Sequence, residues 1–116
     1  MEKTIMIDGK EVRLKSTAAT ALRYKAQFGK DFISEIVKLN RLGKLDLKDK
    51  EEVDLESLEN VDFEVFYNFT WVLAKTADPT VPDPLSWLDQ FDEFPLFDII
   101  PQIQDILAAT IQGKKK

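Results

Sequence analysis

The chain has 116 residues, 44% of them hydrophobic, with 16 Lys and Arg against 21 Asp and Glu and a formal net charge of −5. It contains neither Cys nor His, which excludes a disulfide framework, a thiolate metal site and His-based proton transfer. This length and composition predict one globular domain, and the lack of a long apolar run or signal-like start predicts a soluble cytoplasmic protein.

Charge is divided along the chain. Residues 1–50 carry 12 basic against 7 acidic side chains (+5), residues 51–113 carry 1 against 14 (−13), and Lys114–Lys116 add +3. Opposite charges attract over about 8–10 Å at moderate salt, so we expect the basic front and acidic back to pack against each other or against partners. A homo-oligomer with front-to-back contacts is one such arrangement. Assembly that does not change between low and high salt would argue against it.

Residues 1–16 are predicted to form a β-hairpin, because Asp8-Gly9 separates two runs of alternating apolar residues. The apolar positions of these runs are Ile5, Ile7, Val12 and Leu14. A two-stranded ribbon alone is marginally stable in water, so we expect it to lie on a helix or to pair with another chain.

Residues 17–43 predict a helical hairpin. Ser16 or Thr17 is expected to cap the first helix, Gly29 to end it and Asp31 to cap the second. The first apolar strip is expected at Ala18, Ala21, Leu22 and Ala26, with Tyr24 and Phe28 adjoining it. The second is expected at Phe32, Ile33, Ile36, Val37 and Leu39, with Gly43 ending the helix.

Residues 44–60 are predicted to be a charged linker that is loosely pinned or holds one short helical turn. The aromatic-rich helices of residues 61–112 follow. Their first member is expected to begin with Asp62 as N-cap and to end near Thr76. It is apolar on nearly every side, at Phe63, Val65, Phe66, Phe69, Trp71, Val72, Leu73 and Ala74. Such a helix is predicted to be central and buried.

Prolines separate the remaining helices. Asp78-Pro79 ends the central helix, and Asp83 with Pro84 is expected to open the next one. Its apolar positions are Leu85, Trp87, Leu88 and Phe91. Phe94-Pro95 breaks the chain again, and a last helix over 96–112 is expected to face inward at Ile99, Ile103, Ile106, Leu107 and Ile111.

Pro101 lies either in the first turns of this last helix or at a kink, and residues 113–116 form a basic tail. The predicted fold is therefore a single domain over 1–116. It is mainly α (α+β), a small bundle of four to five helices with an N-terminal β-hairpin.

No constellation of residues indicates catalysis. The acidic clusters, at Asp89, Asp92 and Glu93 and at Glu51, Glu52 and Asp54, have no diagnostic spacing and are interpreted as solvated surface. The serines, Ser16, Ser34, Ser57 and Ser86, have no His to activate them. We therefore predict no catalytic residue, no cofactor-binding residue and no metal site, and a protein that is not an enzyme.

Basic side chains on the helical hairpin favour an alternative, a small nucleic-acid-binding regulator. The phosphate contacts would be Arg23, Lys25, Lys30, Lys38, Arg41 and Lys44. The net acidity and the short Gly29-Lys30 turn argue against it, because the rest of the chain would repel a duplex.

A second surface hypothesis concerns the aromatic segment near Pro95. Its large apolar residues are Trp87, Phe91, Phe94, Leu96 and Phe97. A segment broken by proline cannot bury every face of a regular helix, and aromatic residues are enriched in interface cores. These five residues are therefore the predicted partner-binding site.

The segment TIMIDGKEVRLKSTAATALRYKAQFGKDF resembles the start of the tail assembly chaperones of long-tailed (siphovirus-type) phages and prophages of Gram-positive bacteria. The matching features are the Ile-Asp-Gly-Lys hairpin, the Thr17–Thr20 helix entry and the pattern Tyr24-x-x-x-Phe28-Gly29-x-Asp31. Pro84-x-x-Trp87-Leu88 and the final amphipathic helix are similar to the back half of that family.

The resemblance implies a non-enzymatic chaperone that binds the tape measure protein during tail assembly, with the tail tube protein as a further partner. It implies action in the cytoplasm of the bacterial host and absence from the mature virion. It also implies that some chains are extended by a programmed ribosomal frameshift. Lysine codons are A-rich, so Lys114–Lys116 could overlie a slippery site. A gene without an A-run there, or without an overlapping −1 frame, would remove this hypothesis.

Overall fold

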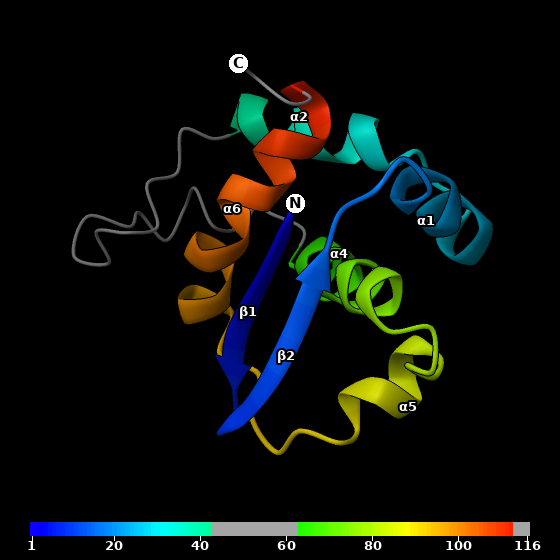
Figure 1. Cartoon of the computed structure of the whole chain (residues 1–116). Helices are drawn as coiled ribbons and strands as arrows, with labels where there is room; N and C mark the ends of the chain where they lie inside the picture. The colour runs from blue at the N-terminus through cyan, green and yellow to red at the C-terminus, as the bar shows by residue number, and fades with distance from the viewer. Residues whose placement is uncertain (43–62, 113–116) are drawn as a thin grey trace.

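A computed structural model describes residues 1–42 and 63–112, and the side-chain surroundings of 1–38 and 63–110. These residues form two strands and five helices (Figure 1), which confirms the predicted mainly α fold with an N-terminal hairpin. In chain order the elements are β1 (Glu2–Ile7), β2 (Lys10–Lys15), α1 (Thr20–Phe28), α2 (Phe32–Leu42), α4 (Glu64–Ala77), α5 (Pro84–Leu88) and α6 (Leu96–Gln112).

Several predictions fall outside this description. They are the linker at 44–60, the helix end at Gly43, the cap at Asp62 and the basic tail at 113–116. None of the helices within the described ranges is long and apolar enough to cross a membrane.

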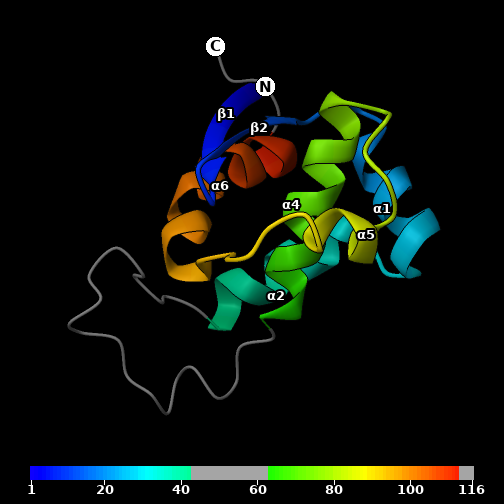
Figure 2. The same cartoon turned by 90° about the horizontal axis from the view of Figure 1, so that it is seen from below.

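The β-hairpin forms as predicted. Asp8 and Gly9 both adopt positive φ, 54° and 74°, as a tight two-residue turn requires. The strands pair antiparallel with Ile5 opposite Val12 and Ile7 opposite Lys10. α4 packs on β2 and α6 on β1, and the view from below shows both helices on one side of the hairpin (Figure 2). The hairpin is therefore stabilised by packing on helices, which is one of the two arrangements predicted from the sequence.

Two lysines share the covered face of the hairpin because strand side chains alternate with a period of two. Lys3 Nζ donates to the carbonyl of Gln102 and lies 3.1 Å from a carboxylate oxygen of Asp105, both on α6. At the other end, Lys10 Nζ donates to the carbonyl of Gln90 and lies 5.4 Å from the ring centre of Phe91. Both ends of the hairpin are thus bonded to the back half of the chain.

The first helix differs from its prediction at its start. α1 begins at Thr20 with Ala19 as its N-cap residue, and no side chain caps it. The expectation that Ser16 or Thr17 caps this helix is therefore wrong. Thr17 instead accepts a hydrogen bond from the N–H of Ala19 (3.2 Å) in the turn that precedes the helix.

The predicted apolar strip of α1 is wrong at three of its four positions, while Ala21 and the adjoining Tyr24 and Phe28 do pack on the core. Ala18 and Ala26 are exposed, and Leu22 is 74% exposed, whereas Thr20 and Tyr24 are buried. The Thr20 hydroxyl accepts from the N–H of Thr17 (2.9 Å) and lies 3.3 Å from the Thr76 hydroxyl. These bonds satisfy the hydroxyl inside the core, which lets a polar residue take the buried face.

The junction between α1 and α2 agrees with its prediction. Gly29 ends α1 at φ 74°, and its N–H bonds to the carbonyl of Lys25 at 2.8 Å. Asp31 then accepts from the N–H of Ser34 at 2.9 Å. Phe32 and Ile36 are buried in the core as expected, but Val37 is exposed, so its predicted place on the apolar face of α2 is wrong. The side chain of Leu39 lies outside the description.

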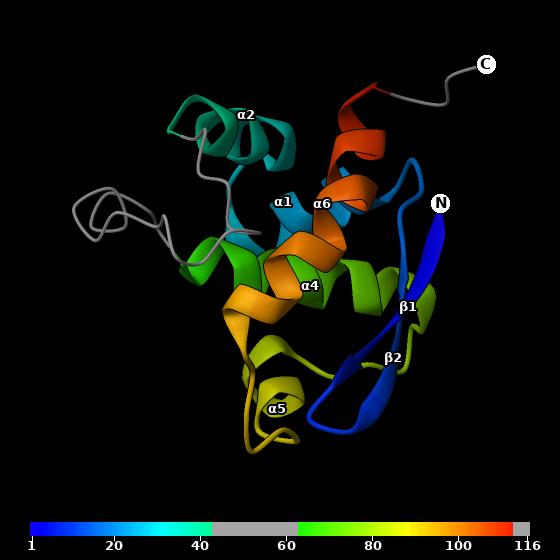
Figure 3. The same ribbon diagram turned by 90° about the vertical axis from the view of Figure 1, so that its left-hand side faces the viewer.

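α4 is the buried central helix, as predicted. Figure 3 shows it crossing the middle of the molecule above α5, and Figure 2 shows it between α6 and α1. Its buried residues are Val65, Phe66, Phe69, Thr70, Trp71, Val72, Leu73 and Ala74. Trp71 Nε1 donates to the carbonyl of Pro82 (2.8 Å), and Lys75 Nζ to those of Pro79 (2.8 Å) and Val81 (2.6 Å). These bonds fix the proline-rich loop against the end of the helix.

α6 spans the range predicted for the last helix. Its buried residues include Ile99, Ile103, Ile106 and Leu107 as expected, together with Ile100. The side chain of Ile111 lies outside the description. Pro101 lies within the helix, as its sixth residue, and its ring nitrogen has no hydrogen to donate to the carbonyl four residues earlier.

Candidate functional site

The aromatic segment predicted to bind a partner lies at the junction of α4, α5 and α6. α5 opens at Asp83, whose carboxylate accepts from the N–H of Ser86 at 3.1 Å, with Pro84 in the first turn. The hydroxyl and N–H of Ser86 lower the pKa of Asp83 below its ordinary value. This start fixes the orientation of the short helix, which carries Trp87 into the core.

The structure brings three of the five predicted residues into one cluster. The Trp87 ring centre lies 5.1 Å from that of Phe91 and 6.3 Å from that of Phe94. Phe91 and Phe94 lie 6.1 Å apart, and Tyr67 of α4 stacks on Phe94 at 5.0 Å. Ring pairs at these separations stabilise a fold by more than the burial of their apolar area alone. The cluster therefore holds α4 against the turn that follows α5.

The five residues differ in how accessible they are. Trp87 is only 5% exposed and belongs to the core, so its ring does not face a partner in this conformation. Phe91, Phe94 and Leu96 are half-buried and pack against the core. Phe97 is 38% exposed, and its ring lies edge-on to Phe63 at 5.9 Å. Phe97 is the member of the set that offers most surface.

Beside this cluster lies a pocket that we name the α4–α5 groove. Its volume is about 510 Å³, and its lining residues are Gln27, Phe28, Glu64, Tyr67, Asn68, Asp83, Pro84, Leu85 and Leu88. They come from α1, α4 and α5. Tyr67 lines the groove and its ring also contacts that of Phe94, so the groove adjoins the aromatic cluster.

The groove has an apolar interior and polar edges. Phe28, Tyr67, Pro84 and Leu88 are half-buried along it, and Leu85 is 74% exposed. Leu85 is one of the apolar positions named for this helix, but it does not belong to the core. The short α5 turns Trp87 into the core, and Leu85, two residues earlier, then projects outward at the groove.

The groove is acidic. Glu64 and Asp83 line it, and no basic residue does so among the described part of the chain. Asp89, Asp92 and Glu93 follow α5 and are all exposed. An apolar pocket with an acidic border can hold apolar side chains of another polypeptide while attracting basic residues beside them.

The other residues singled out in the sequence do not converge on a reactive centre. Within 1–42 and 63–112, no three acidic side chains are grouped as metal ligands would be. Ser34 and Ser86 bond to the cap residues Asp31 and Asp83, and the Ser16 hydroxyl lies 2.6 Å from that of Thr110. The hydroxyl groups of these serines therefore take part in helix caps and in packing between elements.

The basic residues of the helical hairpin are dispersed. Arg23 is half-buried and donates to the Thr76 hydroxyl at 3.1 Å. Lys25, Lys30 and Lys38 are exposed. The side chains of Arg41 and Lys44 lie outside the description. Arg23 therefore serves the packing of α1 on α4.

Sequence reasoning did not find the groove residues Phe28, Tyr67 and Leu85 as a set. They come from three helices whose relative placement the sequence does not state.

Comparisons with protein-family models, with curated proteins and with solved structures found no match to this chain.

Proposed function

We propose that this chain is a non-enzymatic tail assembly chaperone of a long-tailed phage or prophage, and that its client is the tape measure protein. The observation that carries the proposal is the α4–α5 groove, an apolar pocket of about 510 Å³ with Leu85 exposed at it and acidic residues along it. The resemblance of the N-terminal segment to that chaperone family is what names the client.

The groove suits an amphipathic helix of the client. Helix-in-groove recognition places apolar residues at i, i+3, i+4 and i+7 in an apolar pocket. Phe28, Tyr67 and Leu88 would contact those residues, while Glu64 and Asp83 would attract basic residues on either side. Binding of this kind would shield apolar stretches of a long helical client until the tail assembles, without any chemical step.

The same proposal includes the remaining features implied by the resemblance. The chaperone acts in the cytoplasm of the bacterial host, is absent from the mature virion and also contacts the tail tube protein. A frameshift-extended product shares this domain, with the shift near the codons of Lys114–Lys116.

Co-expression tests the proposal. The chain is produced with the large protein encoded next to it in its genome, and the two are purified through a tag on the chain. We expect them to elute together, and the large protein to stay soluble only when the chain is present. Separate elution would contradict the proposal. Steeply salt-dependent retardation of DNA by the chain alone would favour the nucleic-acid-binding alternative instead.

A further inference from the structure

The outer edge of β2 presents backbone groups that the hairpin does not use. Met1 and Ser16 exchange two backbone bonds, of 2.9 and 3.2 Å. In an antiparallel ladder such pairs alternate with pairs whose N–H and C=O groups point away from the partner strand. By the observed register, the outward-pointing groups of β2 therefore belong to Glu11, Arg13 and Lys15.

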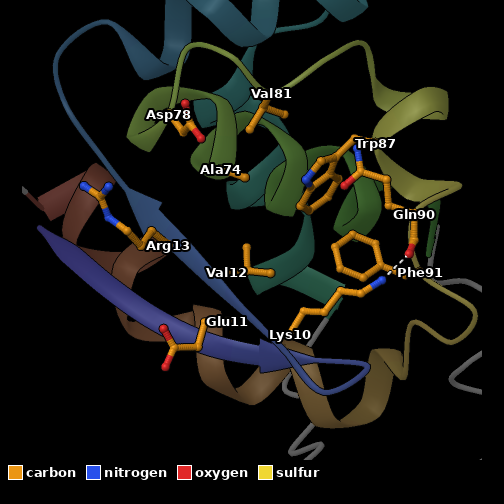
Figure 4. A pocket seen from close by; sticks show the side chains of 10 residues that line it. All are labelled: Lys10, Glu11, Val12, Arg13, Ala74, Asp78, Val81, Trp87, Gln90 and Phe91. Carbon is orange, nitrogen blue, oxygen red and sulfur yellow. Dashed lines mark hydrogen bonds between the residues drawn. The ribbon is translucent and has the colours of Figure 1, made fainter.

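This edge borders a pocket. Among the described residues β2 pairs with β1 alone, and a pocket of about 230 Å³ is lined by the four consecutive residues Lys10, Glu11, Val12 and Arg13. Consecutive residues of a strand point to opposite faces, so a pocket that contacts all four runs along the strand edge. Figure 4 shows Val12 directed toward Trp87 and Phe91 across the pocket, while the Glu11 carboxylate points away from them.

We propose that the edge of β2 pairs with the same edge of a second copy of this chain. The two hairpins would form a four-stranded antiparallel sheet in the order β1-β2-β2-β1 around a two-fold axis. This proposal rests on the strand edge and not on the proposed chaperone function.

The charges on β2 select both the partner and the register. To form backbone hydrogen bonds between the two copies, a residue of β2 whose N–H and C=O point outward must lie opposite another such residue of the second copy. If Val12 lies on the two-fold axis, Glu11 is opposite Arg13 of the second copy, and Arg13 is opposite Glu11 of the second copy. Both pairs are of opposite charge, on the exposed face of the sheet, where cross-strand pairs stabilise the contact.

Each alternative symmetric register contains a pair of like charges. One places Glu11 opposite itself. Another places Arg13 opposite itself, although it also brings Glu11 opposite Lys15 in two pairs. A third, with Leu14 on the axis, places Arg13 opposite Lys15 in both pairs. Charged residues often protect an edge strand from pairing. On β2 the like-charge pairs disfavour these registers, and the register with Val12 on the axis is the one in which both charged pairs are of opposite sign.

Sedimentation equilibrium of charge-reversed variants tests this pairing. Glu11 and Arg13 are both exposed, so reversing either charge leaves the core intact. We expect the wild type to be a dimer, and Glu11→Arg or Arg13→Glu alone to raise its dissociation constant by about tenfold or more, because both cross-strand pairs become repulsive.

Mixing the two variants provides the decisive comparison. In a mixed dimer, the arginine introduced at position 11 of one copy faces the glutamate introduced at position 13 of the other, and the unchanged Arg13 faces the unchanged Glu11. We expect the mixture to dimerise with an affinity near that of the wild type. Lys30→Glu, a reversal of an exposed charge in the turn between α1 and α2, is the control and should leave the dimer intact.

Two results would overturn the proposal. One is a wild type that remains monomeric at every concentration tested, which would leave the edge to an extended segment of a different polypeptide. The other is a wild-type dimer that both reversals leave unchanged, which would place the contact elsewhere on the molecule.

Discussion

Tyr24 shows how a single polar side chain organises the front helices. It is fully buried, and its ring centre lies 4.8 Å from that of Phe28, 5.0 Å from Phe32 and 5.7 Å from Phe69. Its hydroxyl donates to a carboxylate oxygen of Glu35 at 3.3 Å, and Glu35 is itself only 8% exposed. The pair therefore joins α1, α2 and α4 by packing and by a buried polar contact.

Tyr24→Phe keeps the ring contacts and removes the donor to the buried carboxylate. A buried group that loses a hydrogen-bond partner costs about 1–3 kcal/mol, and we expect the free energy of unfolding in urea to fall by that amount. Tyr67→Phe, at the groove, is the control and should change it by less than about 0.5 kcal/mol. Equal effects of the two substitutions would show that the contact with Glu35 contributes nothing particular.

The N-cap aspartates give the protein a pH dependence. Hydrogen bonds from Ser34 lower the pKa of Asp31, and those from Ser86 lower the pKa of Asp83, below the ordinary value of 3.8. The unfolded chain therefore binds more protons than the folded one in this range, so stability rises with pH there. The contribution is complete above the unfolded pKa and is lost as the pH falls through the folded values.

Asp31→Asn and Asp83→Asn should flatten this dependence. Asparagine is also a good N-cap residue, so we expect the double variant to unfold much like the wild type at neutral pH but to lose less stability in acid. Urea unfolding between neutral and acidic pH measures this. The corresponding alanine variants, which lose the caps, should be destabilised at neutral pH as well. An unchanged slope in the asparagine variant would contradict the assignment.

At the scale of elements, Gly29 fixes the turn between α1 and α2. It adopts φ 74°, and no atom lies within 4 Å of the position that a Cβ would take. Gly29→Ala would thus meet no clash and should be destabilising through its backbone conformation alone, by about 1–2 kcal/mol. Gly29→Asn should cost less, because Asn tolerates this conformation better. Thermal unfolding of both variants checks the order, and an alanine variant as stable as the wild type would contradict it.

Local signals were sufficient to predict most of the elements. Asp8-Gly9 between alternating apolar residues gave the hairpin, Gly29 and Asp31 gave the α1–α2 junction, and Asp83-Pro84 gave the start of α5. In each case the residues that form the turn or the cap also carry the sequence signal for it, so no knowledge of distant contacts is needed. The limits of α6 were predictable for the same reason, since Pro95 precedes it.

The buried face of α1 was not predictable from apolar residues alone. Thr20 is inside because the N–H of Thr17 and the hydroxyl of Thr76 lie where it can bond to them, and Leu22 is on the exposed side of the helix. The α4–α5 groove was not predictable from the sequence for a related reason. The groove is assembled from three helices, and only the packing of α5 determines that Trp87 is buried while Leu85 is exposed.

At the scale of the whole molecule, part of the charge division is satisfied within one chain. Lys3 of the basic front bonds to Asp105 of the acidic back. A second contact between the halves is not an ion pair: the carboxylate of Asp8 accepts from the backbone N–H of Asp92 at 2.9 Å. The hairpin is thereby held to α6 and to the turn that precedes it. An exposed ion pair contributes little by itself, so apolar burial remains the main source of stability, while these contacts orient the two halves.

The groove is the part of the molecule on which the proposed chaperone role depends, and Leu85 offers a matched test of it. Leu85 in the groove and Leu22 on α1 outside it are both 74% exposed. Leu85→Glu and Leu22→Glu therefore make the same chemical change with the same small risk to the fold.

The most direct measurement is the affinity of each variant for the purified tape measure protein by titration calorimetry. We predict that Leu85→Glu raises the Kd by about tenfold or more, as expected for an interface residue of above-average importance, and that Leu22→Glu binds like the wild type. Equal binding by all three proteins, or no binding by the wild type, would contradict the account.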